Sequence, residues 1–336
     1  MTAPDTRQTK TALAHPGAFS GPLWGTAQLA VLVVTLALIG GFVVRPERSL
    51  ELLWGVLVPL LPITFLLGTG IWRSVCPLAT LNMLPNPWAG HRGMTTTSAR
   101  AAGVIGIVVL FTLVPARRFL FNTNGLAMAV TVLLVALLAV VLGFVYDAKA
   151  GFCNAVCPVL PVERLYGQYP LLSTDNPRCP SCSACTPRTC IDLSPTRSLL
   201  ETIGPAAEGE NWLRRPFGIF AASFPGFVAG YYTTADVPVS QAGAVYLQTL
   251  VCAMISYALV LSVTMLSGAQ GRVVLPLLAA TAVSIYYWFA APLIAEALGA
   301  SSAAGTAIRV FTLLVVVAWL SSALRAPVRT RVEAVL

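Results

Sequence analysis

Long apolar stretches alternate with short polar segments along most of this chain. About 20 apolar residues in a helix cross the hydrocarbon core of a bilayer. The pattern therefore predicts eight membrane-spanning helices, the third of which extends backwards through a run of threonines. They cover residues 23–44, 52–72, 101–115, 125–146, 216–235, 244–267, 273–295 and 306–324.

The composition agrees with this pattern. Hydrophobic residues make up 57% of the 336 residues and charged residues only 10%, whereas soluble domains carry about 25% charged residues. The expected fold class is an all-α polytopic membrane protein. The net charge of +8 comes mostly from arginines in short loops, which indicates contact with lipid headgroups and does not indicate a nucleic-acid partner.

The polar segments divide the chain into four parts. Residues 1–22 form a cytoplasmic tail, and residues 23–146 form a four-helix membrane region. Residues 147–215 are too polar to cross a bilayer and contain most of the cysteines. Residues 216–336 form a second four-helix membrane region with a basic tail.

The distribution of Lys and Arg predicts the orientation. Arginines on one side of the predicted helices are limited to Arg45, Arg48, Arg117 and Arg118, and the tails, the loop 73–100 and the segment 147–215 carry more basic residues. By the positive-inside rule, both termini and the cysteine-rich segment face the cytoplasm from the inner (cytoplasmic) membrane. In that reducing compartment, clustered thiols bind metal more often than they form disulfides.

The cysteine-rich segment contains the run Cys179-x-x-Cys182-x-x-Cys185-x-x-x-x-Cys190. Three thiols with two residues between neighbours are typical of a bacterial-type ferredoxin loop that holds a [4Fe-4S] cluster. A zinc site usually uses two Cys-x-x-Cys pairs a dozen or more residues apart, so the spacing favours iron–sulfur over zinc. A disulfide-linked loop is the third alternative. The predicted ligands are the four cysteines of the run.

Two copies of a Cys-Pro pattern occur 81 residues apart, each after a pair of predicted helices. Ser74-Val75-Cys76-Pro77 corresponds to Ala155-Val156-Cys157-Pro158, and the second copy has an additional Cys153 where the first has Trp72. Side-by-side packing of the two helix pairs would bring Cys76, Cys153 and Cys157 to one membrane edge as a second metal or iron–sulfur site. Alternatively, each Cys-Pro only ends a helix, because proline cannot continue it.

Apolar helix pairs that end in Cys-x-x-x-Cys-Pro, followed by a ferredoxin-like cysteine run, resemble the membrane-bound polyferredoxins of the NapH/NosR type. The resemblance covers roughly residues 50–195 and depends on the motifs 153–158 and 179–190. It implies a membrane-bound [4Fe-4S] protein linked to quinol oxidation and to other redox subunits. The copper-reducing assembly factor of haem–copper oxidases is a more distant relative of that family.

The leading functional hypothesis is electron transfer between a quinone pool or membrane partner and a redox partner. The chain has no recognisable catalytic triad and no glycine-rich phosphate loop. A second hypothesis is a copper-handling or metal-reducing assembly factor, because thiolates such as those of Cys76, Cys153 and Cys157 favour Cu(I). A third is a redox sensor or structural subunit whose cluster stabilises the loop. The expected contacts are membrane lipid, other redox subunits and a quinone.

Overall fold

The computed structural model describes residues 21–85, 87–88, 92–146, 149–172, 191, 199 and 210–325. These residues are mainly helical, and they form no β-strand beyond one isolated bridge between Arg92 and Tyr146. The prediction of an all-α fold is confirmed. The four cysteines predicted to hold the [4Fe-4S] cluster lie outside the described residues.

Seven segments in the described residues are long and apolar enough to cross a membrane, which indicates a multi-pass membrane protein. The second and third each join regular helix to a π-helical turn. The seven segments are α1 (Gly21–Val44), α2 (Pro46–Leu52) with η2 (Leu53–Leu57) and α3 (Val58–Val75), α5 (Thr96–Ala116) with η3 (Arg117–Phe121), α6 (Gly125–Val145), α10 (Ala242–Ser267), α11 (Gly271–Ala297) and α12 (Ser302–Arg325).

The remaining predicted span corresponds to α9 (Pro216–Thr233), which is formed but is not among the seven. This helix has only 18 residues, and most of its side chains are buried by neighbouring helices. It packs closely on α10, where the Ser256 hydroxyl donates to Ala222 O at 2.7 Å. A Cβ on Gly226 would lie 2.1 Å from Cys252 O, so glycine permits this close approach. A helix enclosed by protein does not need a lipid-compatible surface.

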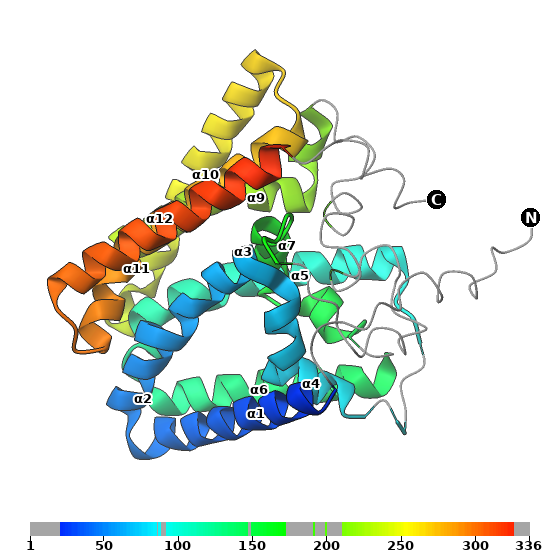
Figure 1. Ribbon diagram of the computed structural model, residues 1–336, viewed down its shortest axis with the longest axis vertical. Coiled ribbons are helices and arrows are strands. Elements are labelled where there is room, and N and C mark those ends of the chain that lie inside the picture. The colour runs from blue at the N-terminus through cyan, green and yellow to red at the C-terminus, as the bar shows by residue number, and fades with distance from the viewer. Residues whose placement is uncertain are drawn as a thin grey trace, which may run out of the picture.

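Shorter helices gather near the ends of the long ones: α4 (Pro77–Met83), η4 (Phe152–Val156), α7 (Leu160–Tyr166), η6 (Glu210–Arg214) and η7 (Val239–Gln241). Figure 1 shows α1 and α6 lying side by side, apart from the group formed by α9 to α12. Helices α1 and α6 are in direct contact with each other. Helices α3, α5 and α7 lie between these two groups (Figure 1).

The main core is built around the aromatic side chains of α9. Phe220 and Phe224 have ring centroids 4.9 Å apart, and Phe227 stacks on Phe111 of α5 at 4.2 Å. Trp212 and Leu213 of η6, both fully buried, close the core where α9 begins. Helix α9 therefore connects α5 to the group formed by α9 to α12 through apolar contacts.

Helix α3 is opened near its prolines, and a tyrosine from α11 occupies the opening. The Tyr287 hydroxyl accepts from Ile63 N at 3.1 Å and donates to Pro59 O at 2.6 Å. A regular α-helix would pair these two backbone groups with each other. Insertion of a side chain into the hydrogen-bond ladder is a recognised cause of helix distortion. Tyr287 thus joins α11 to α3 with polar contacts inside the apolar layer.

Helix α3 is interrupted again at Gly68, which has an extended backbone (φ −179°, ψ 104°). The span predicted over residues 52–72 lies within the second membrane segment, and the structure adds this break inside it. The interruption leaves the carbonyls of Leu66 and Leu67 without helical partners, and they accept from Leu171 N at 3.0 Å and Leu172 N at 2.7 Å. Backbone polar groups in an apolar layer need such partners, so the break and the docked segment depend on each other.

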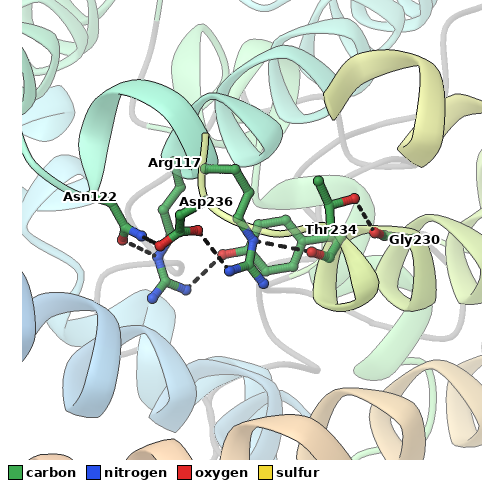
Figure 2. A network of polar contacts seen from close by, with 7 residues as sticks. Arg117, Asn122, Gly230, Thr234 and Asp236 are labelled. Atoms are coloured by element: carbon green, nitrogen blue, oxygen red, sulfur yellow. Dashed lines mark hydrogen bonds and ion pairs between the residues drawn. The ribbon is translucent and has the colours of Figure 1, made fainter. Parts of the chain in front are cut away.

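A polar network at the far end of α5 joins η3 to the end of α9 and the loop after it (Figure 2). Arg118 Nη1 lies 2.9 Å from Asp236 Oδ1, and Arg117 Nη1 donates to the Tyr231 hydroxyl at 2.6 Å. Asn122 bridges them, since it accepts from Arg117 Nε at 3.0 Å and donates to Asp236. Arginines that the sequence analysis used only as topology signals thus bind the turn after α5 to the loop after α9.

Candidate functional site

The two Cys-Pro copies adopt the same backbone conformation. Cys76 has φ −55° and ψ 125°, and Cys157 has φ −58° and ψ 121°. Each cysteine ends a helical segment, α3 or η4, and a short helix with a proline in its first turn follows, α4 or α7. Residues before proline favour this extended region. The repeat found in the sequence is therefore also a repeat in structure.

A buried arginine fastens the two copies together. Arg73 Nη2 donates to Asn154 Oδ1 at 2.7 Å, and Asn154 lies 81 residues further along the chain. Arg73 Nη1 forms an ion pair with Glu163 Oε2 at 2.7 Å. The side chains of Arg73 and Glu163 are only 4% and 3% exposed. We call Arg73, Asn154 and Glu163 the arginine clamp. It holds the end of α3 against η4 and α7.

The clamp brings together the three cysteines that the repeat predicts to meet. Cys153 is 5% exposed and lies in a small core with Ala79 and Phe152, and Cys76 and Cys157 pack against this core. The Cys153 thiol donates to Asn82 Oδ1 at 3.8 Å. Asn82 is held in turn, since its Nδ2 donates to Ala139 O of α6 at 2.8 Å. We call Cys76, Cys153 and Cys157 the three-thiol site.

Burial keeps these thiols protonated. It raises the pKa of Cys153 well above the usual thiol value, although the nearby Arg73 charge opposes the shift. Burial and the Glu163 carboxylate raise the pKa of Cys157 to about 12. Burial also raises the pKa of Cys76. Thiols bind metal as thiolates, so any metal or cluster at this site would have to displace protons.

The last carbonyls of α3 are capped by side chains from other helices. Lys149 Nζ donates to Arg73 O at 3.0 Å, and Gln28 Nε2 of α1 donates to Ser74 O at 2.7 Å. Cations near a helix C-terminus are stabilised by the helix dipole. The sequence analysis did not identify Lys149, Arg73, Asn154 or Glu163 as site residues.

The arrangement of the described side chains limits the groups that the three-thiol site can hold. Within the described part of the chain, no three His, Cys, Asp or Glu side chains are arranged to hold one metal ion. The three-thiol site by itself therefore does not fit a mononuclear copper or zinc ion. A centre that also takes a ligand from outside the described residues, such as Cys190, stays a prediction.

Residues on both sides of the Cys179–Cys190 run are attached to the helical core. Before the run, Leu172 is bonded to the break in α3, and after it, Ile191 is 1% exposed. Leu199, which follows in the sequence, packs in the same hydrophobic core as Trp212. The chain that carries Cys179, Cys182, Cys185 and Cys190 thus leaves from and returns to the core of the protein.

The structure places Cys76, Cys153 and Cys157 in one small core, and a metal or cluster at these thiols stays a prediction. Comparison with protein-family models, curated proteins and solved structures finds no match for this chain. The resemblance to the NapH/NosR-type polyferredoxins accordingly depends only on the sequence motifs.

Proposed function

We propose that this chain is a membrane-bound iron–sulfur protein that transfers electrons between a quinone pool or membrane partner and a redox partner. The observation that carries the proposal is the convergence of the two Cys-Pro turns through the arginine clamp. A fold that only needed to end two helices would require the prolines, but not three cysteines in one small core. Reversible redox chemistry is a reason to gather thiols at one place.

The attachment of the cysteine-rich segment also supports this function. Electron transfer requires carriers to be held at short and constant separations. Leu171 and Leu172 tie the start of the segment to α3, the helix that ends at Cys76. A [4Fe-4S] cluster bound by Cys179, Cys182, Cys185 and Cys190 would supply one-electron chemistry. The fold would then keep that cluster and the three-thiol site on a common support.

A quinol gives up two electrons and two protons, whereas a cluster accepts one electron, so a second acceptor is needed. A centre that includes the three-thiol site, or the cofactor of another subunit, would meet this need. The site lies just beyond Val75, where the second membrane segment ends. We therefore expect the quinone to react near this edge of the membrane, with the cysteine-rich segment on the cytoplasmic side.

The first test is the metal content of the protein purified without oxygen. We expect about four iron and four acid-labile sulfide per chain for one cluster, and more iron if the three-thiol site also holds a cluster. Cys182→Ser should remove the first cluster. Cys252→Ser is the matched control, because Cys252 lies within α10 and outside both cysteine groups. Stoichiometric zinc without sulfide would refute the proposed cofactor.

The second test is electron exchange with a quinone. A reduced quinol analogue added to the oxidised protein in nanodiscs should produce the EPR signal of the reduced cluster, or a quinone should remove it from the reduced protein. Dithionite provides the positive control for reduction. If neither reaction occurs while dithionite reduces the same sample, direct exchange with quinone is wrong. Cys153→Ala then shows whether the three-thiol site contributes to iron content or to the redox spectrum.

A further inference from the structure

A charged side chain lies at the surface of the group formed by α9 to α12, where α11 and α12 meet. Arg309 of α12 is half-buried, and its Cζ lies 4.6 Å from the centre of the Trp288 ring of α11. Trp288 is 57% exposed, so this pair lies on the outside of two membrane-spanning helices. The functional proposal above uses neither residue.

A proline explains one contact of Arg309. Pro292 lies within α11 and has no N–H group, so Trp288 O, four residues earlier, lacks its usual helical donor. Arg309 Nε donates to this oxygen at 2.9 Å. Backbone groups in an apolar layer need such partners. This bond and the Trp288 ring hold the guanidinium in a fixed orientation on the surface of α11.

The bond to Trp288 O uses only one of the five N–H groups of the guanidinium. Within the described residues, Arg309 has no other hydrogen-bond acceptor and no ion pair. Helix α11 has one acidic residue, Glu296, which does not pair with Arg309, and α12 has none. A charge in a membrane-spanning segment is costly without a partner. The N–H groups on Nη1 and Nη2 therefore require an anion that these residues do not provide.

The depth of Arg309 indicates which anion can reach it. The 24 residues of α12 span about 36 Å, and the hydrocarbon core of a bilayer is about 30 Å thick. Arg309 lies about 10 Å along α12 from Ser302, so its backbone is only a short way inside the hydrocarbon. The Cα–Cβ bond of a helical residue tilts toward the helix N-terminus, which here is the nearer membrane edge. Long basic side chains near helix ends extend to the lipid headgroups in this way.

The surface around Arg309 is polar toward that edge and apolar below it. Ser302 and Thr306 are exposed, and their helical spacing places them on the same side of α12 as Arg309. Val310 and Leu293 are apolar and are 53% and 42% exposed. Contacts for a headgroup and for acyl chains are thus available together. This combination suits a phospholipid better than a water-soluble anion.

We propose that Arg309 binds the phosphate group of a phospholipid at the membrane edge where α11 ends and α12 begins. The phosphate oxygens accept from Nη1 and Nη2, since the planar fork of arginine matches phosphate geometry. The Trp288 ring covers one face of the guanidinium. A lipid with net negative charge, such as phosphatidylglycerol, should be preferred because it neutralises the arginine and brings no second cation.

This site is separate from the three-thiol site. A Cβ on Gly55 would lie 2.6 Å from Cβ of Ala297, so α11 ends beside the first part of the second membrane segment. Cys76 follows the other end of that segment, at Val75. Lipid binding at Arg309 therefore does not depend on a metal or an iron–sulfur cluster.

Native mass spectrometry of the full chain in detergent tests the proposal. Phosphatidylglycerol, phosphatidylcholine and diacylglycerol, which has no phosphate, are titrated separately, and the fraction of protein with one bound lipid gives an apparent Kd. We expect phosphatidylglycerol to bind most tightly and Arg309→Gln to weaken it about tenfold, as the loss of a charge-assisted hydrogen bond allows. Arg325→Gln is the matched control, since it removes an exposed arginine at the other end of α12.

A second pair of variants separates lipid binding from folding, because Arg309→Gln also removes the donor to Trp288 O. Pro292→Ala supplies the N–H group that this oxygen lacks, and it should leave phosphatidylglycerol binding unchanged. Adding Arg309→Gln to Pro292→Ala then leaves no carbonyl without a donor. We expect the same loss of about tenfold in this double variant.

Several results would overturn the proposal. They are equal affinity of the unmodified protein for the three lipids, an equal loss in Arg325→Gln, and unchanged affinity in the double variant. Inorganic phosphate is added in a separate arm, and if millimolar phosphate displaces phosphatidylglycerol, the ligand is free phosphate and the assignment to lipid is wrong. The same spectra report the oligomeric state. A dimer that Arg309→Gln dissociates would show that a second copy of the chain, and not a lipid, supplies the partner of Arg309.

Discussion

The arginine clamp offers the sharpest test of how this fold holds its thiols. Glu163→Gln keeps the size and shape of the side chain, but it removes the carboxylate that lies 2.7 Å from Arg73 Nη1. Loss of one partner from a buried ion pair typically costs about 3–5 kcal/mol, because the other charge stays buried. Both side chains are almost fully enclosed, so solvent screening reduces this cost little. A hydrogen bond from Arg73 to the new amide would keep the loss near about 3 kcal/mol.

The loss of this ion pair should mainly lower the free energy needed to open the structure locally at the three-thiol site. The clamp joins the end of α3 to η4 and α7, and Cys153 lies within η4. A loss of about 3 kcal/mol raises the population of an opened state about 100-fold. Alkylation of Cys153 by a membrane-permeant maleimide should therefore accelerate by about two orders of magnitude, provided that opening is fast relative to the reaction. Peptide mass spectrometry at timed intervals measures this rate residue by residue.

Two controls make the result interpretable. Asp236→Asn breaks the contact with Arg118, a pair whose carboxylate side chain is 51% exposed, so its loss should cost at most about 1 kcal/mol. That variant should leave alkylation of Cys153 unchanged. Cys252 on α10 serves as an internal reference in every sample. An equal rate for Cys153 in Glu163→Gln and in the unmodified protein would show that the clamp does not hold the site closed.

Three further predictions concern packing and protonation. Tyr287→Phe removes the hydroxyl that bridges two backbone groups of α3 and should lower the free energy of unfolding by about 1–3 kcal/mol. A lower midpoint of thermal unfolding would show this loss. Tyr246→Phe, at an exposed contact, should change the midpoint little. Gly226→Ala places a methyl group 2.1 Å from a backbone oxygen of α10 and should cost about 1–3 kcal/mol, whereas Gly243→Ala, with open space around it, should not lower the midpoint. The rate of alkylation of Cys157 in metal-free protein should rise about tenfold per pH unit up to about pH 11. The reason is that the pKa of Cys157 is raised to about 12, so its thiolate fraction still grows over this range. A rate that levels off near pH 9 would contradict the raised pKa.

The membrane segments could be predicted from the sequence because lipid-facing helices must be apolar over a fixed length. Their boundaries are close to the predicted ones, and α5 begins at Thr96, within the threonine run to which the prediction extended. The break at Gly68 was not predictable in this way. It is stabilised by the backbone of Leu171 and Leu172, about 100 residues further along the chain. A hydrophobic pattern does not encode such a distant partner.

Helix α9 shows a second limit of the hydrophobic pattern. Its aromatic and small residues predict an apolar helix, but they do not distinguish a lipid-facing surface from a protein-facing one. Gly226 and Gly230, both pressed against α10, are the stronger signal, since small residues mark close helix contacts in membranes. Pro225 and Gly226 lie within the continuous helix α9, and Gly226 marks its interface with α10.

The candidate site was predictable in part, because the 81-residue repeat relates positions that meet in space. The repeat led to Cys76 and Cys157, whose backbones match, and to Cys153 beside them. The same offset also relates Arg73 to Asn154, and these two side chains bond to each other. The sequence analysis did not find this contact, because it counted Arg73 among the basic residues of the loop 73–100 to predict the orientation of the helices. In a membrane protein with an internal repeat, polar residues at matching positions near helix ends are therefore candidates for contacts between the copies. The arginine clamp supports this rule, since a buried charge at a membrane edge is stable only with a partner close by.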